Sequence, residues 1–402
     1  MTHKLPSYSS YESHWHHDAN TVFLNHGSFG ACPDRILQLQ QLLQQRLESE
    51  PVQFMTEEFV DLYLENKKAL AEFVGCNPDD LVFVRNATTG VNTIMNSLTF
   101  NADDEIVSHS HAYGACQNVL FHYAEKFGCK VINAEIPFPI QNENEVIEAF
   151  LKVITPKTKL VMADHITSAT GLVFPIEKLV KELESRGIEV LVDGAHGPGM
   201  THLELEKLGA SYYTGNCHKW ICSPKGSALL YVRKDKQSKI NPLNISHKND
   251  LFAGTDSHWS AQFIWPGTED FSAYLCVKDS INYMGNLFGS WEELRERNRA
   301  LCLSARKSIA AKTGTPLPAP DSMISHLANI LVDEHAEMPA VTFNMMSPLK
   351  KVLMEKYHIQ VPVFLYNKNN LRAWVRIAVQ AYNSPEQFEY LGDCLKEIKE
   401  GR

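Results

Sequence analysis

Between residues 80 and 232, short apolar runs alternate with segments of helical apolar spacing, and this alternation constrains the fold more than any other feature. Parallel strands joined by helices are buried on both faces and read as continuous apolar runs. The pattern therefore predicts an α/β fold whose mostly parallel sheet is covered on both sides. Strands are expected at 81–84, 105–107, 130–134, 159–163, 189–192 and 227–232. Helices are expected between them at 88–98, 114–127, 143–154 and 176–186.

The flanking segments predict further units. Helical apolar spacing occurs at 34–49 and 57–74, segment 235–262 is polar and loop-rich, and residues 269–311 look largely helical. Residues 321–402 predict a smaller α+β unit, with strands near 327–332, 340–343, 361–365 and 373–379 and a last helix at 384–399. The 402 residues suffice for one large α/β domain and a smaller one. We expect an N-terminal arm and helix at 1–55, a large domain at 56–285 and a small domain at 286–402.

Composition argues against several classes of protein. The formal net charge is −9 without a long basic run, which disfavours a nucleic-acid partner. No apolar stretch approaches the ~20 residues that span a bilayer, and the N-terminus lacks the apolar core of a secretory signal. Nine cysteines form no CxxC pair, the pattern of reduced thiols in a cytoplasmic protein. His109 and His111 form an HxH pair without a nearby carboxylate or cysteine, so we expect no metal site.

The segment from Leu191 to Lys219 carries the strongest chemical signal. A strand delivers Asp193, and about one helix and one strand later the chain reaches Tyr213-Thr214-Gly215-Asn216-Cys217-His218-Lys219. A lysine on such a loop suits a Schiff base with pyridoxal 5′-phosphate (PLP), and the carboxylate suits the protonated pyridine nitrogen. The competing interpretation is a capping aspartate and a surface lysine. The pair, together with the segments below, favours PLP.

Five other segments could meet the cofactor or its substrate. Arg85–Gly90 places two hydroxyls and free N–H groups at a helix start, which suits a phosphate as well as a simple threonine cap. Tyr113 ends a strand, where it could stack on the ring or simply pack. Residues 164–168 follow a parallel strand, as ligand-binding or turn residues do. Residues 25–30 form a glycine-rich turn that permits close backbone approach. Arg372 and Arg376 could bind a carboxylate or lie solvated on an edge strand.

In their order along the chain, these segments resemble the class V aminotransferase family of fold-type I PLP enzymes, with the isopenicillin N epimerase-like branch as the nearest match. The resemblance extends from about residue 21 to residue 383. It implies a large domain with a mostly parallel seven-stranded sheet, a smaller C-terminal α+β domain and a homodimer with shared active sites. The motifs that carry it are FLNHGSFG (23–30), EPVQFM (50–55), VRNATTGVNT (84–93), DHITSATG (164–171), DGAHGPG (193–199), GNCHKW (215–220), WPGTED (265–270) and VRIAVQAYN (375–383).

The resemblance also implies roles for individual residues. Lys219 would bind PLP covalently, Asp193 would pair with the ring nitrogen, His196 would lie near the ring's phenolic oxygen, and Tyr113 would cover the ring. Thr88, Thr89 and His218, with Thr214 as a weaker candidate, would hold the phosphate, and Thr268 would reach the phosphate of a neighbouring subunit. Arg376, helped by Asn25 or His26, would bind the carboxylate of an amino-acid substrate. His165 also counts among the cofactor-binding candidates. The catalytic candidates are Lys219, Asp193 and Tyr113.

Several reactions remain open, and all begin when Lys219 removes the substrate Cα proton. Epimerisation ranks first by resemblance and needs a second acid or base, for which Tyr113, His26 and His165 are candidates. Carbon–sulfur lysis follows closely, and transamination ranks third. A cysteine desulfurase is disfavoured because segment 311–375 contains no cysteine to carry the sulfur. A non-enzymatic scaffold is disfavoured because it would need neither Lys219 nor Asp193.

Overall fold

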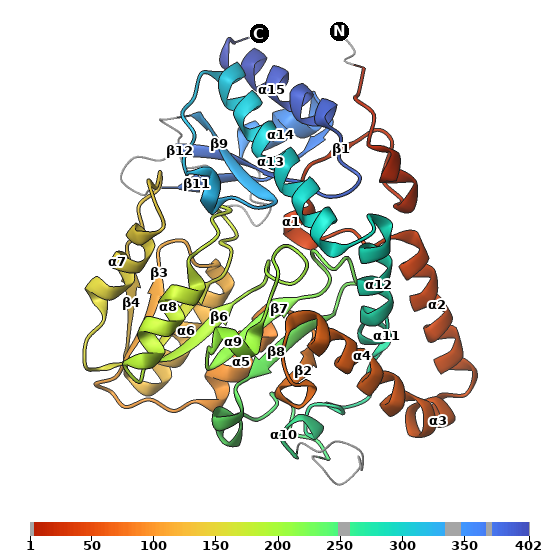
Figure 1. Cartoon of the computed structure of the whole chain (residues 1–402), viewed down its shortest axis with the longest axis vertical. Coiled ribbons are helices and arrows are strands. Elements are labelled where there is room, and N and C mark those ends of the chain that lie inside the picture. The colour runs from red at the N-terminus through yellow and green to blue at the C-terminus, as the bar shows by residue number, and fades with distance from the viewer. Residues whose placement is uncertain (1–3, 248–257, 334–346, 367–371, 402) are drawn as a thin grey trace.

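The large lobe is built on a seven-stranded sheet whose strands run in the order β2-β8-β7-β6-β5-β3-β4 (Figure 1). The computed structural model describes residues 4–247, 258–333, 347–366 and 372–401. The strands are β2 (Leu81–Val84), β3 (Glu105–His109), β4 (Lys130–Ala134), β5 (Thr158–Asp164), β6 (Glu189–Asp193), β7 (Tyr212–Asn216) and β8 (Ala228–Val232). Strand β8 runs antiparallel to both of its neighbours, and the other pairings are parallel. The predicted mostly parallel α/β sheet is confirmed.

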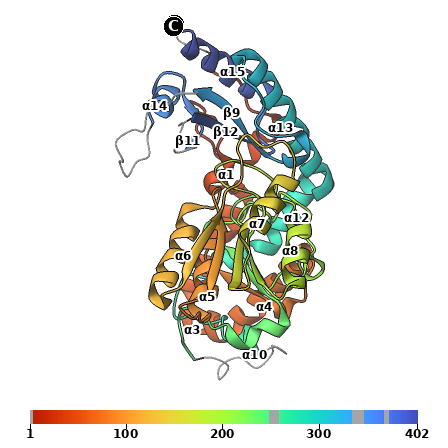
Figure 2. The same cartoon turned by 90° about the vertical axis from the view of Figure 1, so that its left-hand side faces the viewer.

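Helices cover both faces of this sheet, because alternate residues of each strand enter two different apolar cores. In β6, Val190 and Val192 belong to one core, while Leu191 belongs to the other. Figure 2 shows α6 and α8 on opposite sides of the sheet. The helices of this lobe are α4 (Phe59–Val74), α5 (Ala87–Ser97), α6 (Gly114–Phe127), α7 (Asn144–Val153), α8 (Ile176–Ser185), α9 (Leu205–Leu208), α10 (His258–Ala261), α11 (Ser272–Leu275) and α12 (Val277–Leu287). With both faces covered, the strand ends are where a ligand can reach the sheet.

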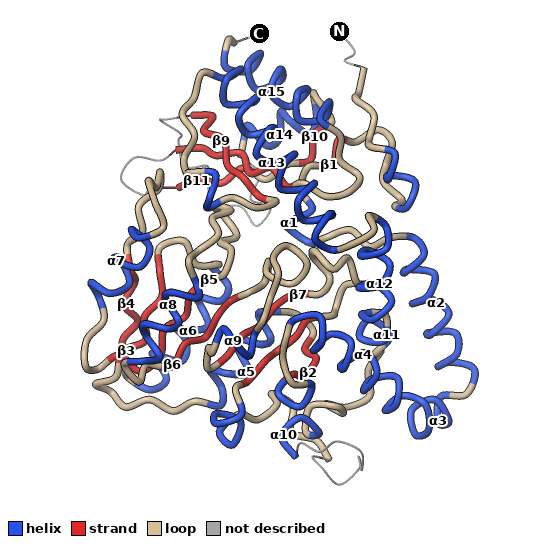
Figure 3. Tube along the Cα trace, viewed as in Figure 1, coloured by secondary structure: helices blue, strands red, loops and turns tan. Residues whose placement is uncertain are grey.

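A second lobe holds an antiparallel sheet of three strands in the order β11-β12-β9 (Figure 3). Its strands are β9 (Leu327–Asp333), β11 (Val363–Tyr366) and β12 (Arg372–Ala378). Its helices are α13 (Trp291–Thr313), α14 (Pro348–Glu355) and α15 (Pro385–Lys399), and α13 packs along α15. A capping box at Ser384 and Gln387 starts α15 where the sequence predicts the last helix.

The N-terminal segment connects the two lobes. Strand β1 (Val22–Phe23) pairs in parallel with β10 (Ile359–Gln360), and the Ser9 N–H donates to the Tyr382 carbonyl. The chain then passes through the short helix α1 (His26–Phe29) to α2 (Asp34–Ser49) and α3 (Pro51–Gln53) beside the large lobe. A π-helical stretch at Phe54–Glu58 leads into α4. The division at residues 55 and 285 stays a prediction.

Two features of the structure differ from the prediction. The sequence assigns Tyr213–Gly215 to a loop before Lys219, but these residues form most of β7, where every side chain is buried. This strand packs closely against α5, since a Cβ at Gly90 of that helix would clash with the Thr214 side chain. Helix α14 was not predicted. The strand expected at 340–343 lies outside the described residues.

Candidate active site

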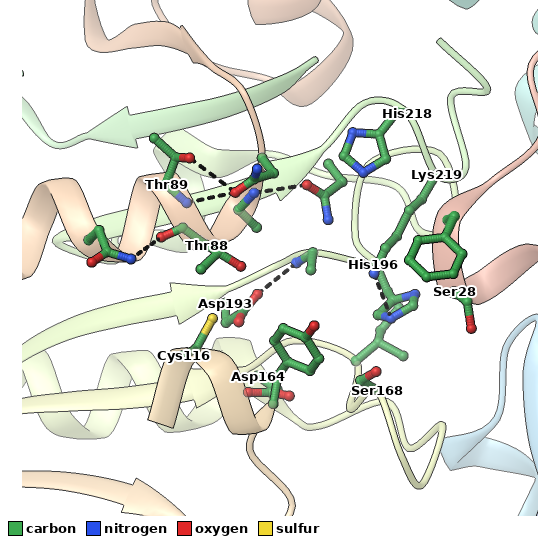
Figure 4. Close-up of a pocket in the computed structure, with 18 of the residues that line it drawn as sticks. Ser28, Thr88, Thr89, Cys116, Asp164, Ser168, Asp193, His196, His218 and Lys219 are labelled. Atoms are coloured by element: carbon green, nitrogen blue, oxygen red, sulfur yellow. Dashed lines mark hydrogen bonds between the residues drawn. The ribbon is translucent and has the colours of Figure 1, made fainter. Parts of the chain in front are cut away.

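A cavity of about 540 Å³ lies where β5 and β6 end, next to the N-termini of α5 and α6. Figure 4 shows Lys219, His196, Asp193, Asp164 and Cys116 together around it. The carboxyl ends of parallel strands meet at one edge of a sheet, so residues distant in sequence converge there. The structure thus brings together most of the residues that the sequence predicts for PLP.

Lys219 extends into the cavity from the turn after β7. Its Nζ lies 3.2 Å from His196 Nε2. Burial, reinforced by the positive charge of Arg376, lowers the pKa of Lys219 to about 8. About a tenth of its amine is therefore neutral at pH 7, far more than for an ordinary lysine, and this form can act as a nucleophile or base.

Asp193 ends β6 with one satisfied and one unsatisfied oxygen. The Ala195 N–H donates to its Oδ1 at 3.0 Å, while Oδ2 is buried without a hydrogen-bond partner among the described residues. Burial and the neighbouring Asp164 carboxyl raise the pKa of Asp193 to about 6. An unpaired buried carboxylate oxygen is costly, and a protonated ring nitrogen is the partner that offsets this cost. The site therefore fits PLP at this position.

The start of α5 forms the anionic end of the cavity. Asn86 caps the helix by accepting from the Thr89 N–H at 2.8 Å, and the side chains of Thr88 and Thr89 line the cavity. Helix N-terminal N–H groups and hydroxyls together favour a phosphate. His218 also lines the cavity and donates from Nδ1 to the Ser227 carbonyl. Burial lowers the pKa of His218 to about 4, so the ring is neutral near pH 7 and its Nε2 carries no proton. Nε2 can donate to a phosphate only if the negative charge of the phosphate raises that pKa enough to protonate the ring.

Tyr113 stands at the N-cap of α6 and lines the cavity with 47% of its surface exposed. This is the position from which the sequence predicts that it covers the ring. His196 lines the cavity beside Lys219, and its place near the ring stays a prediction.

Three other predicted residues lie elsewhere. Thr214 is fully buried in β7 and donates to the Leu229 carbonyl, so its hydroxyl is directed under α5 rather than into the cavity. His165 contacts the Tyr213 hydroxyl through Nδ1, while its neighbours Asp164 and Ile166 line the cavity. His26 is buried behind Lys219, with Nε2 on the Lys219 carbonyl and Nδ1 on the Tyr382 hydroxyl. Their local sequence patterns do not reveal which way these side chains point.

Arg376 in β12 is 1% exposed and has no carboxylate partner among the described residues. It donates to the Ser168 carbonyl, and its Nη2 lies 3.3 Å from Asn25 Oδ1 and 3.2 Å from Ser28 Oγ. Burial lowers the pKa of Arg376 to about 10, so it stays charged near neutral pH. Because Ser28 and Ser168 line the cavity, this buried cation lies at its edge, where a substrate carboxylate would neutralise it.

Sequence reasoning missed two residues of the site. Asp164 is buried at the cavity, directly across the ladder from Asp193. Equal register on adjacent strands was the signal that could have selected Asp164 over His165. Cys116 in α6 is buried beside Asp193, and burial together with that carboxylate raises the pKa of its thiol. Nothing in the helical pattern singles out Cys116.

Thr268 is exposed and does not line the cavity of its own chain. Its neighbour Glu269 pairs with Arg85, just before the α5 cap. A role for Thr268 in a second subunit stays a prediction.

An amine of lowered pKa, a buried unpaired carboxylate and a helix N-terminus in one cavity define a PLP-dependent enzyme of fold type I. The chain belongs to the class-V aminotransferase family, whose description matches residues 31–391. The predictions of family, fold, cofactor and enzymatic nature are thereby confirmed.

Two curated relatives carry different names. The chain is 28% identical over 403 residues to the "Probable L-cysteine desulfhydrase, chloroplastic" of Arabidopsis thaliana, covering 95% of this chain and 84% of the relative. It is 27% identical over 393 residues to the isopenicillin N epimerase of Streptomyces clavuligerus, covering 95% of this chain and 96% of the relative.

Solved structures share the fold. The cystine C-S lyase C-DES in complex with cysteine persulfide matches with a TM-score of 0.78 at 20% identity, covering 94% of this chain and 98% of that chain. The cysteine desulfurase CsdA of Escherichia coli matches with a TM-score of 0.77 at 16% identity, covering 98% of both chains. Across the described residues, no helix combines the length and apolarity needed to cross a membrane.

Proposed function

We propose that this enzyme is a carbon–sulfur lyase that releases sulfide from L-cysteine. The proton leaves Cα, the Cβ–S bond breaks, and water later replaces nitrogen at Cα. L-cysteine and water thus give pyruvate, ammonia and hydrogen sulfide. The relatives named L-cysteine desulfhydrase support this reaction, as does Lys219, the one amine that lines the cavity among the described residues.

The observation that carries the proposal is that only one of the three residues expected to supply a second base lines the cavity. An epimerase that uses two bases needs one on each face of the substrate Cα, whereas elimination needs one base and a stable leaving group. Of the three residues expected to supply the second base, His26 and His165 are hydrogen-bonded outside the cavity, and only Tyr113 lines it. A thiol has an ordinary pKa of about 8.5, so sulfide leaves without a dedicated acid.

The chain's own residues divide the work. PLP, when bound, supplies the electron sink that stabilises negative charge at Cα. Arg376 holds the substrate carboxylate at the cavity edge and thereby fixes which bond of Cα faces Lys219. Lys219 Nζ takes the Cα proton, and Asp193 keeps a proton on the ring nitrogen by charge pairing. Cys302 and Cys394 are buried in α13 and α15, away from the cavity, which agrees with a reaction that needs no sulfur-carrying cysteine.

Epimerisation is the second candidate, because Tyr113 remains available and a relative is named isopenicillin N epimerase. Incubation with L-cysteine, cysteine sulfoxide conjugates and a penicillin precursor in deuterium oxide separates the two. The lyase predicts sulfide, pyruvate and ammonia in equal amounts from L-cysteine. A growing D-isomer without sulfide, abolished by Tyr113→Phe, would contradict it. Amino transfer to an added keto acid would indicate the transaminase instead.

The proposal includes a homodimer with shared active sites. Phe29 is 75% exposed, and it lines the cavity together with the partly exposed Tyr113 and Leu243. Large apolar side chains at a cavity rim are what a second copy would cover. A chain that sediments as a monomer at assay concentration and keeps full activity would rule out the dimer. A cytoplasmic location also stays a prediction.

A further inference from the structure

Trp220, which follows Lys219 directly, is held in one orientation. It is 1% exposed and packs with Ile166, Met200, Leu327 and Ala378. The His26 ring lies 4.8 Å from its ring and the His326 ring 5.3 Å, centroid to centroid. Its indole N–H is thereby aimed at one acceptor, His196 Nδ1, at 3.2 Å.

This contact determines where the neutral His196 ring carries its proton. An indole nitrogen only donates, so His196 Nδ1 must accept. A neutral imidazole has one N–H, which then belongs to Nε2, and Nε2 is the atom 3.2 Å from Lys219 Nζ. The His196 N–H can donate to Nζ only when that amine has a free lone pair, which an ammonium lacks.

We propose that Trp220 is a positioning residue that fixes the proton of His196 on Nε2 and so favours the neutral amine of Lys219. The effect precedes the chemistry at Cα and applies whichever reaction follows, so it does not rest on the proposed lyase activity. Without the indole donor, the proton can move to Nδ1, and Nε2 can then accept a hydrogen bond from a protonated Lys219.

Other groups around the pair act on charge rather than on the tautomer. Burial, Lys219 and Arg376 hold the pKa of His196 well below its usual value, and His26 and His218 act in the same direction. For Lys219, burial and Arg376 lower the pKa, whereas Asp193, Cys116 and Asp164 raise it. A ring that stays neutral has a defined tautomer, so the Trp220 contact has its full effect.

The first test uses the unmodified chain without PLP. Nitrogen-15 NMR of labelled histidines distinguishes the two tautomers, and the His196 signal is identified by its loss in His196→Gln. The proposal requires the Nε2–H form, and an Nδ1–H form would overturn it without any Trp220 variant.

The second test is Trp220→Phe, which keeps an aromatic ring and removes the donor. The rate at which the PLP-free chain captures PLP, followed by visible absorbance, depends on the neutral amine. Its pH midpoint should rise by about one unit, with about tenfold slower capture below the midpoint. Trp259→Phe is the matched control, because it removes another buried indole N–H bond, to the Ile240 carbonyl.

A double variant separates this role from packing. In a His196→Leu background the side chain can neither accept from Trp220 nor exchange a donor for an acceptor at Lys219. Adding Trp220→Phe there should leave the pH midpoint unchanged. An equal rise in that background, or no rise in Trp220→Phe alone, would show that Trp220 does not act through the His196 tautomer.

Discussion

The cavity floor and the group proposed to bind the substrate carboxylate are assembled in different ways. The floor of the cavity is formed by Asp164, Asp193 and Lys219, which lie at or just after the ends of adjacent parallel strands, and the two aspartates each end an apolar run. The proposed carboxylate anchor instead joins Arg376 to Asn25, 351 positions away, and to the Ser168 carbonyl, 208 positions away. The floor depends on one sheet, whereas the anchor depends on both lobes staying together. Variants of Lys219 and Asp193 should therefore alter the chemistry, and variants of Arg376 should alter substrate placement.

The largest effect is expected at Lys219. Lys219→Ala removes both the covalent link to PLP and the proposed base, so kcat should fall by about 10⁴-fold or more. Borohydride reduction of the unmodified enzyme followed by peptide mapping should place the pyridoxyl label on Lys219. A label on Lys225, whose Nζ donates to the Gly30 carbonyl instead, would contradict the assignment.

Asp193→Asn should follow, with a loss in kcat of about 10³-fold, because an amide cannot hold a proton on the ring nitrogen by charge pairing. PLP should still bind through the start of α5, so the visible absorbance should persist while turnover falls. Near-normal turnover would contradict the pairing. A colourless variant would show that PLP binding depends more on Asp193 than on the start of α5.

Arg376→Leu tests the anchor. It should raise KM and lower kcat/KM by about 10²-fold. Because the Arg376 charge lowers the pKa of Lys219, the variant should also capture PLP with a higher pH midpoint. Arg372→Leu is the matched control on the same strand, since Arg372 does not line the cavity, and its kcat/KM should stay within about twofold. If Arg372→Leu lowered kcat/KM and Arg376→Leu did not, Arg372 would be the carboxylate-binding residue.

The same contrast explains how far the sequence could predict the molecule. Asp164 and Asp193 end apolar runs that the sequence predicts as strands, whereas the sequence predicts a loop at β7 before Lys219. The Arg85–Gly90 segment does contain the start of α5. His26, His165 and Thr214 belong to the right segments, yet their side chains point elsewhere because long-range packing sets their direction. Asn25 does reach Arg376, but only the pairing of β1 with β10 and the chain path after it reveal this. Local pattern therefore locates a segment, and tertiary contact selects the residue within it.

The smallest effect is expected at Asp164, although it matches Asp193 in type, burial and register. Its backbone N–H donates to His109 Nε2 at 3.2 Å, so that nitrogen accepts, and Asp164 Oδ1 lies 3.1 Å from the same atom. Burial raises the pKa of Asp164 well above its usual value, which favours a neutral carboxyl that can donate toward this nitrogen, and burial lowers the pKa of His109 to about 3.

Asp164→Asn replaces that neutral acid with an amide that donates to the same nitrogen, so kcat/KM should stay within about fivefold. An acid whose folded pKa exceeds its unfolded pKa of about 3.9 loses stability as pH rises from that value through the folded pKa. The variant lacks this loss, so its stability relative to the unmodified chain should increase between about pH 5 and about pH 8. Urea unfolding of both PLP-free chains at the two pH values measures the difference. If turnover instead fell as far as in Asp193→Asn, the two carboxyls would have the same role, and the proposed difference between Asp164 and Asp193 would be wrong.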